Sequence, residues 1–209
     1  MLRAVGLVFD GAAPNAPPVK RLLRAAALAI SALFWLSAPA AANDRIEVRS
    51  AELRPAADGD GVTLEATFDF DLPWPLEDAV NRGVALYFVV DFELYRTRWY
   101  WFDDRRISTA LTYRLSYSPL SRQYRLARGT LALPYDSLGA ALTGLRRVTN
   151  WTVIEPGVLS PGESYSARVR LRLDTTQLPR PFQMSALTNR DWTLASEWRN
   201  VPVTPDLAR

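Results

Sequence analysis

The chain has 209 residues, of which 48% are apolar and 22% charged, as is ordinary for a globular protein. It has no His and no Cys, which excludes Ser-His-Asp triads, thiol enzymes and His-ligated zinc sites. The single Lys is Lys20, so no Schiff-base lysine is available in the rest of the chain. The net charge of +3 belongs to residues 1–42. The remainder holds 21 basic and 21 acidic residues, which argues against nucleic acid as a partner.

Residues 1–42 are predicted to contain a removable secretion signal. Residues 20–24 carry three positive charges, residues 25–36 are apolar apart from Ser31, and small residues follow as far as Ala42. This order is typical of a signal peptide, with cleavage after Ala42 or, alternatively, after Ala40. We therefore expect a periplasmic or secreted protein that meets the membrane only through this segment, before cleavage.

Two further hypotheses concern the same segment. It could be kept as a membrane anchor, although a spanning helix needs about 20 apolar residues and Pro39 interrupts this run. Residues 1–18 match neither a signal nor a regular element, so we hypothesise that translation starts at Val19. N-terminal sequencing of the precursor would test this.

Beyond Ala42 the first predicted element is a β-hairpin. Residues 45–54 form a strand with an irregularity near Ser50, and residues 55–61 form the loop. The second strand alternates strictly between apolar and polar residues, which indicates an antiparallel strand with one wet face. Its inward residues are Val62, Leu64, Ala66, Phe68 and Phe70.

The middle of the chain is predicted to be mostly strands joined by tight turns. One or two helical turns come first and end at Gly83. The strands and turns that follow are residues 84–95, a turn at Asp103-Asp104, residues 106–117, a turn at 119–121, and one or two short strands within 123–133.

One amphipathic helix is predicted over residues 138–148. Apolar residues recur at spacings of three and four, and Asp136 or Ser137 can cap the start. We expect this helix to pack on the sheet and to expose Arg146 and Arg147. A short strand follows at residues 151–154.

A Pro-Gly turn followed by Tyr165 opens the last part of the chain, as at the late strands of immunoglobulin-like sandwiches, where the Tyr hydroxyl bonds back across the corner. The strand after it alternates, with Arg168, Arg170 and Arg172 facing outward. Residues 178–181 are predicted to turn and residues 192–198 to form the final strand.

These elements predict an all-β, mostly antiparallel β-sandwich of the immunoglobulin/fibronectin-like kind with one short amphipathic helix. Residues 43–203 would form its single domain and residues 204–209 a tail.

The arrangement resembles a family of proteobacterial exported proteins, the domain of unknown function 4390. The resemblance covers about residues 45–203 and rests on four motifs. These are Trp99-Tyr-Trp-Phe102, Leu159-Ser-Pro-Gly162 with Tyr165, Leu178-Pro-Arg-Pro181 and Trp192…Ser196-Glu-Trp198. The resemblance implies no activity and no site residues, but it suggests an association with membrane sensor kinases.

The aromatic block is the predicted binding surface. In a strand, Trp99 and Trp101 share one face while Arg98 and Tyr100 share the other, so large aromatics lie on both faces. Aromatic planes beside arginines can stack sugars or grip side chains of a partner. The competing interpretation is that both faces are covered within the fold. The predicted site comprises Arg96, Arg98, Trp99, Tyr100 and Trp101.

Two other clusters are weaker candidates. The stripe of Arg168, Arg170 and Arg172 could bind anionic lipid or glycan, but such stripes are commonly wet sheet faces with acidic partners. A pair of carboxylates could hydrolyse glycans, and the candidates are Asp69, Asp71, Asp91, Glu93, Asp103 and Asp104.

We therefore expect an exported, non-catalytic binding domain of the bacterial cell envelope that uses no metal and no cofactor. Its partner would be a protein or a cell-envelope glycan. The alternatives are a carboxylate-dependent glycan hydrolase and a periplasmic partner of a membrane sensor kinase.

Overall fold

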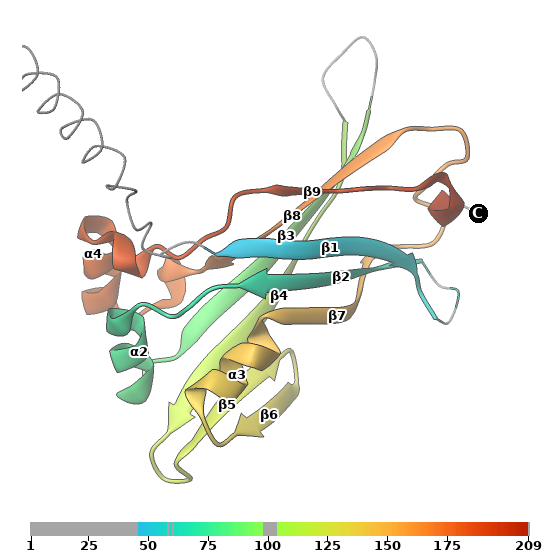
Figure 1. Cartoon of the computed structure of the whole chain (residues 1–209). Coiled ribbons are helices and arrows are strands. Elements are labelled where there is room, and N and C mark those ends of the chain that lie inside the picture. The colour runs from blue at the N-terminus through green and yellow to red at the C-terminus, as the bar shows by residue number, and fades with distance from the viewer. Residues whose placement is uncertain (1–45, 58, 60, 98–103, 209) are drawn as a thin grey trace, which may run out of the picture. The chain divides into compact units, whose positions relative to one another are not determined.

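A computed structural model describes residues 46–57, 59, 61–97 and 104–208 (Figure 1). The predictions for residues 1–42, including the secretion signal and its cleavage, lie outside these residues, as do those for residues 98–103. The prediction of a mostly antiparallel β protein is confirmed, because every strand pair is antiparallel and two sheets are formed.

The smaller sheet has three strands in the order β1-β2-β7. They are β1 (Glu47–Pro55), β2 (Val62–Asp69) and β7 (Arg147–Ile154). The register of β1 against β2 shifts between Val48 and Ser50, so the predicted irregularity is a bulge at Arg49. The predicted inward residues of β2 are all buried.

The larger sheet has six strands in the order β6-β5-β4-β3-β8-β9. They are β3 (Leu86–Arg96), β4 (Asp104–Ser118), β5 (Gln123–Arg128), β6 (Leu131–Tyr135), β8 (Tyr165–Leu173) and β9 (Arg199–Val201). The immunoglobulin/fibronectin-like topology is not confirmed, since that topology divides about seven strands into sheets of four and three.

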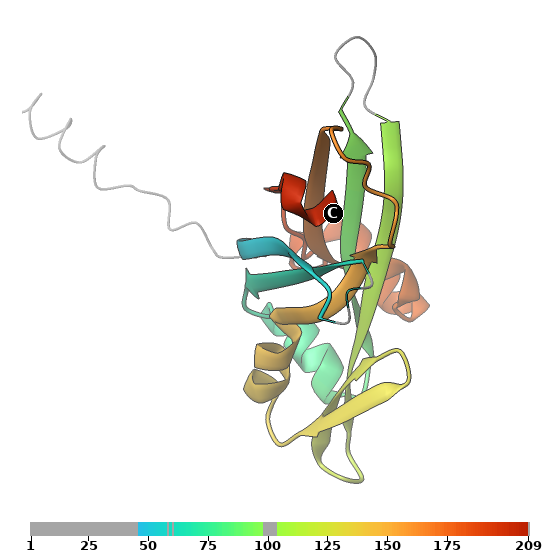
Figure 2. The same ribbon diagram turned by 90° about the vertical axis from the view of Figure 1, so that its right-hand side faces the viewer.

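The hydrophobic core lies between the two sheets, which face each other in Figure 2. Phe92 of β3 meets Trp151 of β7 edge to face, with ring centroids 6.4 Å apart. Phe70 packs on Phe88 at 5.8 Å. Among the described residues, those buried in the core run from Ile46 to Leu207, and they belong to a unit of the chain that is compact by itself.

The prediction of a single helix is wrong, because the described residues contain three α-helices, although the helical turns expected over residues 76–82 do lie in α2. They are α2 (Trp74–Asn81), α3 (Leu138–Leu145) and α4 (Arg180–Thr188). Short 3-10 turns add η1 (Thr175–Gln177), η2 (Arg190–Trp192) and η3 (Pro205–Ala208). The segment 178–181 was expected to turn, but its second proline stands in the first turn of α4, where a missing N–H costs nothing.

Helix α3 is the predicted amphipathic helix, but it is shorter than expected. The Ser137 hydroxyl caps it by accepting a hydrogen bond from the Ala140 N–H at 3.2 Å. The chain leaves the helix after Leu145, and Val148 belongs to β7. Arg146 is half-buried rather than exposed, because its guanidinium donates to the Phe70 carbonyl at 3.0 Å, whereas Arg147 is exposed as predicted.

The prediction of a final strand over residues 192–198 is also wrong. Residues 190–192 form η2, and the regular pairing with β8 is made by β9 instead. Between them the chain runs along β8 irregularly: the Leu173 N–H donates to the Leu194 carbonyl at 2.7 Å and the Ser196 N–H to the Leu171 carbonyl at 2.8 Å.

Candidate binding site

The predicted site begins where β3 ends. Arg98, Trp99, Tyr100 and Trp101 lie outside the described residues, so the structure does not test their exposure. Arg96 is described, and its guanidinium forms an ion pair with Glu163 in the loop before β8. Beside it the Thr97 N–H donates to the Ser164 carbonyl at 2.9 Å. The end of β3, where it pairs with the start of β4, is therefore tied to residues 163–164.

Tyr165 fixes the same loop from the other side. Its hydroxyl accepts a hydrogen bond from the Ser160 N–H at 3.1 Å and donates to Glu163 at 2.9 Å. The predicted bond back across the corner is thus confirmed. Glu163 is shared by Tyr165 and Arg96, so one carboxylate joins the corner to the end of β3.

The outer face of the large sheet near the end of β3 carries a charged network. Tyr95 donates to Glu93 at 2.7 Å, and Arg168 donates to the same carboxylate at 2.7 Å and to the Tyr95 hydroxyl at 2.8 Å. Arg105 of β4 approaches Glu93 at 3.5 Å. Glu93 is therefore the centre that links three strands.

The network shifts the pKa of both groups at its centre. Burial of the Glu93 carboxyl acts to raise its pKa, but the hydrogen bonds from Tyr95 and Arg168 and the charges of Arg168 and Arg105 together hold the pKa below its usual range. The hydrogen bond to Glu93, with burial, raises the pKa of Tyr95. Glu93 is thus held ionised, which suits an ion-pair partner.

Each arginine of the stripe on β8 has an acidic partner. Arg170 and Arg172 both donate to Asp91, at 2.8 and 2.9 Å, while Arg168 pairs with Glu93. The interpretation as a wet face with acidic partners is therefore supported for these three arginines, and they do not form a free anion site.

Trp198 completes this face and was not predicted as part of a site. Its ring lies beneath the guanidinium carbons of Arg168 and Arg170, at 4.5 and 4.4 Å from the ring centroids. The spacing of two between Arg168 and Arg170 puts both guanidinium groups on one face of β8, where an aromatic ring can stack on them. No pattern in the sequence shows that the ring is that of Trp198.

The comparisons with known proteins give a family but no function. The family model described as a domain of unknown function, DUF4390, matches residues 43–202. The chain belongs to the DUF4390 family. No curated protein and no solved structure matches it.

The carboxylates that could serve a hydrolase are engaged in ion pairs in this DUF4390 domain. Asp91 and Glu93 hold arginines, and Asp71 and Asp104 pair with Arg146 and Arg106 respectively. The hydrogen bond from Arg49 holds the pKa of Asp69 below its usual range. A general acid needs the opposite shift, and Asp103 lies outside the described residues.

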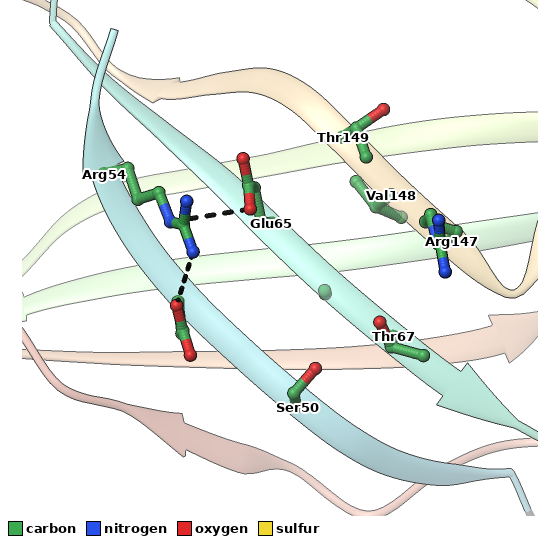
Figure 3. A pocket seen from close by; sticks show the side chains of 9 residues that line it. Ser50, Arg54, Glu65, Thr67, Arg147, Val148 and Thr149 are labelled. Atoms are coloured by element: carbon green, nitrogen blue, oxygen red, sulfur yellow. Dashed lines mark hydrogen bonds and ion pairs between the residues drawn. The ribbon is translucent and has the colours of Figure 1, made fainter.

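Two hollows on the described surface of the DUF4390 domain are lined mainly by polar side chains. One of about 280 Å³ lies on the outer face of the small sheet, where Arg54 reaches Glu52 and Glu65 beside the hydroxyls of Ser50 and Thr67 (Figure 3). Another of about 280 Å³ lies near the end of β3 and is lined by five residues: Tyr95, Ser166, Ala167, Arg168 and Asn200.

The residues that the structure describes include no cluster of three or more His, Cys, Asp or Glu able to hold a metal ion. Among those residues, no helix combines the length and apolar character needed to cross a membrane.

Proposed function

We propose that this DUF4390 chain is an exported, non-catalytic binding domain of a proteobacterial cell envelope. Its binding element would be the aromatic segment, which comprises Trp99, Tyr100 and Trp101. The observation that carries the proposal is that the residues just before this segment are anchored. Arg96 and Tyr165 share Glu163, and the Thr97 N–H donates to the Ser164 carbonyl.

Anchored residues beside a binding segment favour binding for a thermodynamic reason. Ordering a segment upon binding costs conformational entropy, and neighbouring residues already held in place reduce that cost. Trp and Tyr then supply large contact areas with few rotatable bonds. The polar hollow at Tyr95 and Arg168 adjoins the anchored end of β3 and offers hydrogen-bonding groups for a sugar or a peptide.

The inventory of reactive groups supports binding over catalysis. Residues 43–209 have no imidazole, thiol or amine side chain, and the pKa of Glu93 is shifted away from the value that a general acid needs.

The Tyr165 corner is the feature that supports a relationship to immunoglobulin- or fibronectin-like sandwiches.

Capture from envelope extract tests the proposal. Residues 43–209 would carry a photo-crosslinking amino acid in place of Tyr100, and a matched bait would carry it in place of Trp74, an exposed Trp on α2. We expect a specific protein or glycan adduct from position 100 alone, and its loss in Trp101→Ala. Equal adducts from both positions would refute the assigned surface.

The same preparation separates the alternatives. Adducts are identified by mass spectrometry, and a membrane sensor kinase among them would identify the partner class that the family resemblance suggests. Incubation with purified sacculi tests the hydrolase. Release of soluble sugar that Glu93→Gln or Asp91→Asn abolishes, while the fold is kept, would overturn the non-catalytic assignment.

A further inference from the structure

The hairpin formed by β4 and β5 carries an unusual excess of positive charge. Residues 105–135 contain no Asp or Glu, whereas residues 43–104 contain 14 acidic and six basic residues. The basic residues within 105–135 are Arg105, Arg106, Arg114, Arg122, Arg125 and Arg128. The neutral total of the domain therefore conceals a strongly basic segment.

Half of these arginines are unpaired. Arg114, Arg122 and Arg125 are exposed, and none has an ion-pair or hydrogen-bond partner for its side chain among the residues that the structure describes. The others are engaged: Arg105 with Glu93, Arg106 with Asp104, and Arg128 with the carbonyls of Thr149 and Asn150. The free charges are thus concentrated at one end of the hairpin.

The register places two of the free arginines on the same face. Arg114 pairs with Ala127 and Arg125 with Ser116, so the two arginines are diagonal neighbours on the outer face, with Cα atoms roughly 7–8 Å apart. Two carboxylates approach this end: Asp136 accepts a hydrogen bond from the Gln123 amide at 3.5 Å, and the charge of Glu77 on α2 acts on Tyr124. The three positive charges therefore outnumber the negative charges near them.

The tip of the hairpin is apolar and held in shape. Leu120 is 99% exposed, in a turn where Pro119 restricts the backbone and the Ser121 N–H donates to the Ser118 hydroxyl at 3.5 Å. In Figures 1 and 2 this turn, between β4 and β5, is the lowest part of the ribbon. It therefore projects from the sheet in both views.

Contacts at the base support the tip. The rings of Tyr117 and Tyr124 pack across the two strands at 4.9 Å. The Tyr124 hydroxyl also donates to the Asn81 side chain of α2 at 2.6 Å. The tip can therefore meet a partner without first having to be ordered.

We propose that this hairpin docks on the surface of an anionic phospholipid bilayer, with Leu120 entering the lipid and Arg114, Arg122 and Arg125 contacting phosphates. A lone apolar side chain at a projecting tip, surrounded by unpaired cations, combines the two contributions that hold proteins at a membrane surface. An acidic protein would use the cations but would need an apolar site placed to match Leu120, whereas lipid offers an apolar contact wherever the tip enters it. None of these four residues belongs to the aromatic segment of the proposed function.

Vesicle cosedimentation with residues 43–209 tests the proposal. We expect binding to vesicles of equal parts phosphatidylglycerol and phosphatidylcholine, no binding to pure phosphatidylcholine, and weakening by salt. Each of Arg114→Gln and Arg125→Gln should lower the partition coefficient about fivefold, and Leu120→Ser about tenfold.

Two matched controls replace equivalent residues elsewhere. Arg147→Gln removes an exposed arginine of the small sheet that has no ion-pair partner among residues 46–97 and 104–208 as described, and Leu187→Ser removes a Leu of α4 that is 79% exposed. Both should bind vesicles as the wild type does, and so should the double variant Trp99→Ala/Trp101→Ala. Absent binding to anionic vesicles, or equal losses in the controls, would overturn the proposal. Losses with the Arg variants but not with Leu120→Ser would also overturn it, in favour of an acidic macromolecule.

Discussion

Replacing Ser196 by Ala should destabilise the domain more than any exposed Ser to Ala change. Ser196 is the one polar residue classed as buried in the described part of the chain. Its hydroxyl accepts a hydrogen bond from the Leu171 N–H at 3.0 Å, where the chain departs from β8 and no carbonyl takes that place. Alanine would leave a buried main-chain donor unpaired, which costs about 1–3 kcal/mol.

The cost can be measured by urea unfolding of residues 43–209, followed by Trp fluorescence. A loss of about 2 kcal/mol would lower the melting temperature of a domain of this size by roughly 4–8 °C. Ser185→Ala is the control, because its hydroxyl bonds to the Pro181 carbonyl on the exposed side of α4, and it should change stability by less than about 0.5 kcal/mol. If Ser196→Ala is as mild as the control, the assigned pairing of residues 194–196 with β8 is refuted.

Two further predictions follow from the charged network and from a hairpin loop. Because the pKa of Glu93 is lowered in the folded state, its contribution to stability is full above the unfolded pKa of about 4.3 and lost as the pH falls through the lower folded value. Urea midpoints measured across acidic pH should therefore fall less steeply in Glu93→Gln than in the wild type; parallel curves would contradict the assignment. Gly61→Ala should cost several kcal/mol, since φ is +93° and a Cβ would stand 2.3 Å from the Ile154 carbonyl oxygen. Gly59→Ala has φ +78° and open space, so it should cost only about 1 kcal/mol; equal denaturation midpoints for the two would refute the close approach.

The parts of the fold that sequence periodicity predicted are those in which one strand face meets the core. Alternation placed β2 and β8 correctly because burial of every second residue is a local property of a strand. The bulge near Ser50 was also predictable, since it interrupts that alternation. Local pattern therefore sufficed wherever the structure depends on which face is buried.

The errors lie where tertiary contacts override the local pattern. Val148 continues a helical spacing, yet it belongs to β7 because that strand must pair with β2 through Ala66. Residues 192–198 look like a strand, but they pair with β8 only around Ala195, and the Trp198 ring stacks against Arg168 and Arg170. Helix α4 was missed because none of its residues is fully buried and only Phe182 and Ala186 pack against the core, which is a short apolar pattern.

The same limit separates the two arginine patterns on the large sheet. Arg168 and Arg170 on β8, like Arg114 on β4, project from the outer face with alternating spacing, so periodicity treats them alike. Their neighbours differ: β3 sets Asp91 and Glu93 directly opposite Arg170 and Arg168, whereas Arg114 lies between Tyr87 and Ala127. A sequence shows which face a side chain shares, but pairing between strands decides what lies beside it. Whether a row of arginines is an ion-pair network or a free basic surface is therefore settled by the strand order.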